Sequence, residues 1–173
     1  MFMLLNNIRK PNKIIPLSKA LLHTGLIAVA GMGLGVTAKL LDIYTSTLGN
    51  IFSQMSVWIF LCTTMSVLSS TPFRAAINVF SFCAGMLPAY YVTAELTSSV
   101  YSSLFIHGWT LFALLTPALG FCTWYARGKG LLSKCIIAGI ILVMLAAAVI
   151  LFDKIRVADI VFAVLTCFVL IKK

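Results

Sequence analysis

The residues of this chain that could do chemistry are charged and aromatic side chains near the ends of long apolar runs. Lys39 and Asp42 are three apart at the end of the first run, so they share one face of a helix and can pair. An ionisable group at membrane depth costs on the order of 3 kcal/mol unless it is paired or hydrated. Two interpretations follow. Either Lys39 binds an anionic substrate with Asp42 as counter-ion, or it is a snorkelling lysine with a local partner.

A second group of candidate residues belongs to the third and fourth apolar runs. Pro88 interrupts the third run and is expected to kink it, which places Tyr91 and Glu95 either at a cavity or in a lipid-facing aromatic belt. His107 and Trp109 open the fourth run, where they line an outer vestibule or belong to the interfacial belt. The candidate substrate-binding residues are therefore Lys39, Asp42, Tyr91, Glu95, His107 and Trp109.

Small and amide side chains indicate where helices pack. Gly31 and Gly35 form a G-x-x-x-G pattern, which predicts close approach of a second helix, either inside the bundle or from a partner subunit. Asn78 lies one turn into the third run, where an amide usually bonds another helix. Arg74, four residues earlier on the same face, is interpreted as an orientation anchor. The predicted packing residues are Gly31, Gly35 and Asn78.

The other reactive residues argue against an enzyme, a metal site or a cofactor. The five cysteines lie within or beside apolar runs, without a C-x-x-C pair or a histidine at ligand spacing, which predicts small buried side chains. His23 and His107 are expected at opposite faces of the membrane and cannot share a metal. The sequence contains no H-E-x-x-H, G-x-S-x-G or P-loop motif. We therefore expect no catalytic residue, no cofactor and no metal.

The elements that position these residues are predicted to be membrane-spanning helices. Of the 173 residues, 61% are apolar and 10% are charged, whereas a soluble domain carries about 25% charged residues. This composition excludes an ordinary soluble enzyme, a disordered chain and a nucleic-acid-binding module. A helix needs about 20 mostly apolar residues to cross a bilayer. The chain offers six such segments in one all-α membrane domain over 1–173: about 21–41, 51–68, 73–94, 104–126, 134–152 and 157–171.

The charges predict how this bundle is oriented, because Lys and Arg near span ends stay in the cytoplasm. With the N-terminus inside, ten of the thirteen basic residues lie on the inner side. The other three, Lys39, Lys154 and Arg156, lie on the outer side together with all four acidic residues. We therefore expect the chain to lie in the plasma membrane with both termini in the cytoplasm. Its expected surroundings are the lipid bilayer, and no nucleic-acid partner is expected. The residues expected inside are Arg9, Lys10, Lys13, Lys19, Arg74, Arg127, Lys129, Lys134, Lys172 and Lys173.

Spans one to four and the basic turn after them share residues with other membrane proteins. These residues are Gly35, Lys39, Leu40, Asp42, Trp58, Pro72, Arg74, Ala75, Ala76, Asn78, Val79, Phe80, Gly85, Met86, Tyr90, Tyr91, Pro117, Trp124, Tyr125, Gly128, Lys129 and Gly130. In them the chain resembles a group of small six-span membrane proteins of Gram-positive bacteria, which implies the six-span fold but no cargo or reaction. In size and span count it is also similar to the substrate-binding components of energy-coupling-factor transporters.

Two functions from different classes fit these observations. The first is binding or transport of a small solute through an outward-facing cavity, by an oligomer of this chain or by one subunit of a complex. The alternative is a non-transporting assembly or regulatory subunit whose helices dock a larger membrane partner. The first predicts that changing Lys39 or Glu95 alters solute binding. The second predicts that leucine at Gly31 or Gly35 disrupts co-purification with the partner.

Overall fold

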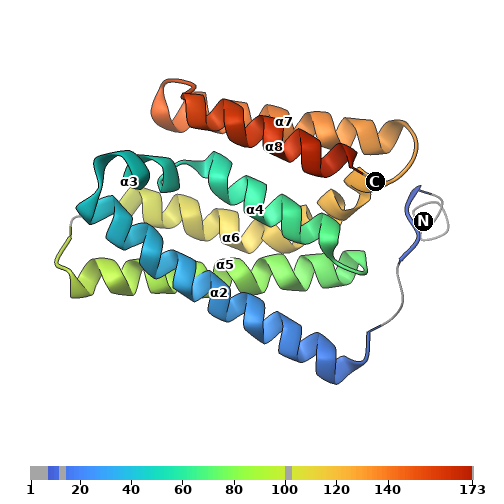
Figure 1. Cartoon of the computed structure of the whole chain (residues 1–173), viewed down its shortest axis with the longest axis horizontal. Coiled ribbons are helices and arrows are strands. Elements are labelled where there is room, and N and C mark those ends of the chain that lie inside the picture. The colour runs from blue at the N-terminus through green and yellow to red at the C-terminus, as the bar shows by residue number, and fades with distance from the viewer. Residues whose placement is uncertain (1–7, 12–14, 100–102, 173) are drawn as a thin grey trace.

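The computed structural model describes residues 8–11, 15–99 and 103–172, and the regular elements of this part are all helices (Figure 1). The all-α prediction is therefore confirmed. Two of the basic residues expected inside, Lys13 and Lys173, lie outside the described residues. The elements are α2 (Leu17–Tyr44), α3 (Ser46–Phe52), α4 (Met55–Leu68), α5 (Pro72–Leu96), α6 (Ser103–Trp124), the 3-10 helix η1 (Tyr125–Arg127), α7 (Leu131–Phe152) and α8 (Val157–Ile171).

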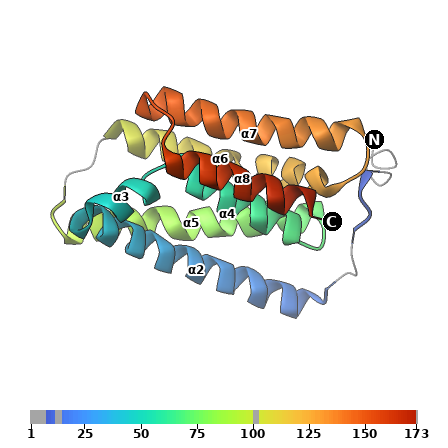
Figure 2. The ribbon, with the colours of Figure 1, turned by 45° about the horizontal axis from the view of Figure 1, so that its top comes forward.

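The helices form an up-and-down bundle in which α4 and α6 lie between the pair α2–α5 and the pair α7–α8 (Figures 1 and 2). Segment 8–11, the turns after α4 and α6, and the end of α8 gather at one end, which we name the terminal end (Figure 1). Helix α3, the end of α5 and the turn after α7 gather at the other end, which we name the distal end. The short turns explain this arrangement, because helices joined by a few residues must pack antiparallel.

Four stretches of the described chain are long and apolar enough to cross a membrane: α2, α5, Ile106–Arg127 and α7. Helices α3 and α4 meet at 52° and make a fifth crossing only if both belong to one broken span. Helix α8 has 15 residues and α4 has 14. These lengths correspond to about 22 and 21 Å, short of the ~30 Å of a bilayer core. The structure thus has four or five helices of spanning length, not clearly the six that the sequence predicted.

The glycines of the G-x-x-x-G pattern pack α2 against α5 of the same chain. A Cβ atom built on Gly31 would overlap the carbonyl oxygen of Phe82, and one built on Gly35 would overlap that of Met86. From the other side, a Cβ on Gly85 would overlap the carbonyl oxygen of Ala28. Only residues without a side chain allow such close approach of two backbones. The sequence left open whether the second helix belongs to the bundle or to a partner subunit. In the structure it is α5, a helix of the same bundle.

Asn78 and Arg74 join α5 to its neighbours near the terminal end. The hydroxyl of Thr24 on α2 donates to Asn78 Oδ1 at 3.1 Å, and Asn78 Nδ2 donates to Ser69 Oγ at 3.1 Å. Arg74 Nη2 donates to the carbonyl oxygen of Ala20 at 2.6 Å and to the Thr24 hydroxyl at 3.1 Å. Arg74 therefore holds α2 and α5 together in addition to any role in orientation.

Two further arginines at the terminal end bind carbonyl groups at helix C-termini. Arg9 donates to the carbonyl oxygens of Val67 (2.9 Å) and Trp124 (2.6 Å), and its guanidinium lies 4.1 Å from the Trp124 ring centroid. Arg127 donates twice to the carbonyl oxygen of Val169, at 2.9 and 2.7 Å. Cations stabilise helix C-termini, where carbonyl dipoles converge. Burial and the neighbouring Arg127 lower the pKa of Arg9 to about 10, so it stays charged at neutral pH.

Candidate functional site

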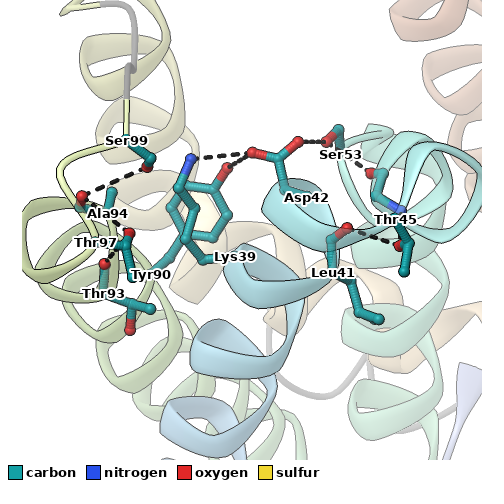
Figure 3. A network of polar contacts seen from close by, with 11 residues as sticks. Lys39, Leu41, Asp42, Thr45, Ser53, Tyr90, Thr93, Ala94, Thr97 and Ser99 are labelled. Atoms are coloured by element: carbon teal, nitrogen blue, oxygen red, sulfur yellow. Dashed lines mark hydrogen bonds and ion pairs between the residues drawn. The ribbon is translucent and has the colours of Figure 1, made fainter.

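The predicted pair of Lys39 and Asp42 forms a polar cluster with Tyr90 at the distal end (Figure 3). Lys39 Nζ lies 3.0 Å from Asp42 Oδ2, and the Tyr90 hydroxyl donates to the same oxygen at 3.3 Å. Lys39 Nζ also lies 5.2 Å from the centroid of the Tyr90 ring, a cation–π distance. Lys39 is 2% exposed and the Asp42 side chain 36% exposed. The ammonium is therefore enclosed, and its counter-ion faces the surroundings.

The tight α2–α5 contact explains why Lys39 is buried. Lys39 lies one turn after Gly35 on α2, so it continues the face that packs on α5. Tyr90 lies one turn after Met86, the residue that meets Gly35. A lysine placed there cannot extend into solvent without separating the two helices. Its charge must be met locally, and Asp42 and the Tyr90 ring meet it.

Asp42 also contacts the break between α3 and α4. The hydroxyl of Ser53 donates to the carbonyl oxygen of Gly49 at 2.8 Å, and Asp42 Oδ1 lies 3.4 Å from the same hydroxyl. A Cβ on Gly49 would lie 2.7 Å from the Asp42 Cα, so α3 can pack this closely on α2 only with glycine there. The Trp58 indole donates to the carbonyl oxygen of Phe52 at 2.8 Å and closes the break from the α4 side. We name the two residues at the bend, Ser53 and Gln54, the α3–α4 joint.

A second acidic residue, Asp159 on α8, holds the joint from the opposite side. The hydroxyl of Ser56 donates to Asp159 Oδ1 at 2.6 Å. With the Gln54 amide in the orientation that satisfies both of its neighbours, its nitrogen donates to the same oxygen at 3.1 Å. The backbone N–H of Arg156 donates to Asp159 Oδ2 at 2.9 Å, while the Arg156 guanidinium donates to the Gln54 amide oxygen at 3.0 Å. Asp159 is only 2% exposed.

The spacing of three between Arg156 and Asp159 predicts a surface ion pair, and the structure corrects this prediction. The carboxylate is buried against α4, and the nearest group from Arg156 is its backbone N–H. Sequence reasoning also missed Gln54, Ser56 and Tyr90 as members of these clusters. The available signal was Gln54, the one amide side chain inside the predicted span 51–68.

The other candidate residues lie further along α5 and on α6. Tyr91 is half-buried, with its ring edge against Tyr90 at a centroid distance of 5.4 Å. Glu95, in the last turn of α5, and His107, on α6, are exposed. Trp109 is half-buried and packs its ring edge on Phe112 at 6.0 Å. The structure thus brings Lys39, Asp42 and the two tyrosines together, and the outer vestibule remains a prediction.

The bundle contains a cavity of about 220 Å³ away from this cluster, between α4, α6 and α7. It is lined by Ile59, Cys62, Thr63, Ser66, Val79, Phe112, Thr116, Leu119, Gly120, Cys122, Thr123, Ile136, Gly139, Ile140 and Val143. None of the six predicted substrate-binding residues belongs to this lining. A cavity at this place was not expected from the sequence.

The cysteines differ in exposure, and Cys167 is half-buried. Cys62 and Cys83 are buried, with their Sγ atoms 3.8 Å apart, and all five cysteines are free. Cys122 and Cys135 are exposed, so the expectation of small buried side chains was wrong for these two. These two side chains face outward from α6 and α7. Because a cysteine behaves as a small apolar side chain, apolar surroundings outside the bundle accommodate it as readily as burial does. Within the described residues, no group of three or more His, Cys, Asp and Glu side chains is placed to hold a metal ion.

No family model, no curated protein and no solved structure matches this chain. The resemblances drawn from single residues in the first four spans therefore remain predictions, and function must be argued from the geometry of the clusters.

We expect Asp159→Asn to destabilise the protein by about 2 kcal/mol. All three groups that contact the Asp159 carboxylate are donors: the Ser56 hydroxyl, the Gln54 amide and a backbone N–H. An amide offers one acceptor and one donor, so a buried donor loses its partner, at about 1–3 kcal/mol. Thermal unfolding in detergent measures the effect. The matched control is Asp153→Asn at an exposed position of the same end, expected within about 0.5 kcal/mol of wild type. Equal losses for both variants would contradict this account.

Proposed function

We propose that the chain crosses the plasma membrane six times, with both termini in the cytoplasm, and binds a small anionic solute at its outer, distal end. In this topology α3 and α4 form one broken crossing and α8 a short one. The gathering of segment 8–11 and the end of α8 at one end supports an even number of crossings (Figures 1 and 2). The basic residues of that end, Arg9, Arg74 and Arg127 among them, support its cytoplasmic side.

The observation that carries the solute proposal is the unequal exposure of the Lys39–Asp42 pair. Lys39 is enclosed, and the Asp42 carboxylate that neutralises it is about one-third exposed. A solute carboxylate or phosphate arriving from the outer side meets Asp42 first and can take over its contacts with Lys39 and the Tyr90 hydroxyl. Asp42 would then move away from Ser53, so that the α3–α4 joint would lose its contact with α2.

The position of the pair beside a broken helix supports the same proposal. Transporter sites often lie at interrupted helices, where the chain can change its angle without unfolding a continuous span. Here the two sides of the joint contact different helices: Ser53 lies 3.4 Å from Asp42 of α2, and Gln54 contacts Asp159 of α8. Exchange of Asp42 for a solute anion would loosen the first contact and leave the second in place. Binding is thereby linked to the bend of α3 against α4.

Thermal unfolding of the purified protein in detergent tests the proposal, with a panel of mono- and dicarboxylates, amino acids, carboxylate-bearing vitamins and phosphate. A bound solute at 100 times its Kd adds about 2.7 kcal/mol, which raises Tm by roughly 5–11 °C for a chain of this size. We expect at least one anion to raise Tm for wild type and for the control Lys154→Met, but not for Lys39→Met. Lys154 is an exposed lysine of the same end.

Two results would count against a solute site at Lys39. The first is a panel in which no anion moves Tm by more than the scatter of the measurement. The second is an anion that stabilises Lys39→Met as much as wild type. The alternative function, a subunit that docks a larger partner through Gly31 and Gly35, has less support because α5 already occupies both glycines.

A further inference from the structure

The cavity between α4, α6 and α7 opens on the side of the bundle. Four lining residues at its mouth are exposed, Leu119 and Cys122 on α6 and Gly139 and Val143 on α7. Its floor is formed by buried residues of α4 and α6, including Ser66 and Gly120. We name this cavity the lateral crevice.

The lateral crevice is elongated along the helices and confined to one half of the bundle. On α6 its lining runs from Phe112, near the middle of the helix, to Thr123, next to its end. Eleven residues of helix rise about 16 Å, close to half of the ~30 Å hydrocarbon core of a bilayer. The half in question is that of the terminal end, since α6 ends there (Figure 1). The crevice therefore has the length and depth of one lipid leaflet.

The lining offers little for a polar ligand to bind. It contains no charged residue. The Ser66 hydroxyl donates to the carbonyl oxygen of Cys62 at 2.9 Å, and the Thr116 hydroxyl donates to that of Ala113 at 2.6 Å. Both hydroxyls therefore bond to carbonyl oxygens of their own helices. The two residues present mainly carbon and hydrogen atoms to the opening. A crevice of this kind within a membrane is filled by hydrocarbon, because water gains no hydrogen bonds there.

Basic residues lie where the crevice reaches the terminal end. Helices α6 and α7, which form its mouth, are joined by residues 125–130, and this turn carries Arg127 and Lys129. Lys134 follows in the first turn of α7, and both lysines are exposed. A lipid whose chain enters between α6 and α7 must hold its headgroup at the level of this turn. An anionic headgroup complements the charge found there, at about 1 kcal/mol per basic residue.

We propose that the lateral crevice binds one alkyl chain of an anionic phospholipid, whose phosphate lies against the basic turn between α6 and α7. The occupant is a lipid and not a free solute, because the mouth faces sideways between two helices of spanning length. The proposal does not depend on the solute site at Lys39, which lies at the other end of the bundle. It makes this lipid a part of the folded protein.

Native mass spectrometry of the purified protein with added phosphatidylglycerol or phosphatidylcholine tests the proposal. Gly139 lies at the mouth of the crevice, and a Cβ there would meet no atom within 4 Å, so Gly139→Leu is expected to narrow the mouth without disturbing the fold. Gly33→Leu is the matched control: Gly33 is exposed on α2, with the same free space and outside the crevice. We expect wild type and Gly33→Leu to retain phosphatidylglycerol, and Gly139→Leu to retain at least tenfold less. Equal retention by both variants would overturn the proposal.

The double variant Lys129→Gln, Lys134→Gln tests the headgroup. It is expected to lose the preference for phosphatidylglycerol over phosphatidylcholine while keeping the chain bound, and an unchanged preference would overturn the headgroup assignment. A readout on the wild-type chain avoids any question of folding. Cys122 lines the crevice and Cys135, also exposed, does not. Phosphatidylglycerol should slow alkylation of Cys122 by N-ethylmaleimide several-fold relative to Cys135. Equal rates with and without the lipid would contradict the proposal.

Discussion

Replacing Gly35 with leucine is expected to destabilise the protein by more than about 3 kcal/mol and to leave much of the purified chain aggregated. The atoms that a side chain would meet are the backbone carbonyl and Cα of Met86 on α5. A flexible side chain could rotate away, but a helix backbone cannot, so the whole of α2 must move. Overpacking against movable side chains typically costs 1–3 kcal/mol, and the backbone contact places Gly35→Leu above that range. Thermal unfolding followed by size-exclusion chromatography measures the loss.

Gly33→Leu is the control for this variant, because it makes the same change on the same helix. A Cβ on Gly33 has no atom within 4 Å, and its neighbour Gly35 is buried against α5. We expect Gly33→Leu to unfold within a few degrees of wild type. If Gly35→Leu unfolded at the same temperature, the α2–α5 contact would not be as close as described. A folded Gly35→Leu variant that lost only a co-purifying protein would favour the subunit that docks a partner.

The helices were predictable from the sequence because each depends on its own composition. The six predicted apolar segments overlap α2, α4, α5, α6, α7 and α8. The break at Ser53 and Gln54 was not predictable in this way. It lies inside a segment apolar enough for one helix, and it is fixed by Asp42 and by Asp159, which is 105 residues away from Gln54. Tertiary hydrogen bonds decided the local structure there.

The same distinction separates the parts of the site that were predicted from those that were not. The Lys39–Asp42 contact follows from a spacing of three on one helix, which is a local rule. Tyr90 joins them only because the glycines set the register of α5 against α2. Asp159 was expected at the surface because its sequence neighbours are charged. It is buried because α8 packs on α4, a contact between segments about 100 residues apart.

Asp42→Asn is expected to destabilise the protein by about 3 kcal/mol, because it removes the counter-charge of an enclosed ammonium. Breaking a buried ion pair from one side costs 3–5 kcal/mol, and the lower value applies since the Asp42 side chain is 36% exposed. The Tyr90 ring, 5.2 Å from Lys39 Nζ, compensates only in part. Chemical denaturation in mixed micelles, compared with the wild-type midpoint, gives the difference.

A double-mutant cycle with Lys39→Met separates the pair from the rest of the cluster. Methionine keeps the apolar stem of Lys39 and removes its charge, so the cost of Asp42→Asn should fall from about 3 to about 1 kcal/mol in that background. The cost that remains in the Lys39→Met background measures the contacts of Asp42 with Tyr90 and Ser53, which lie 3.3 and 3.4 Å away. If Asp42→Asn cost the same with and without Lys39, the ammonium would not depend on Asp42. An incoming anion would then have no counter-ion to replace, and the solute site proposed at the distal end would lose its basis.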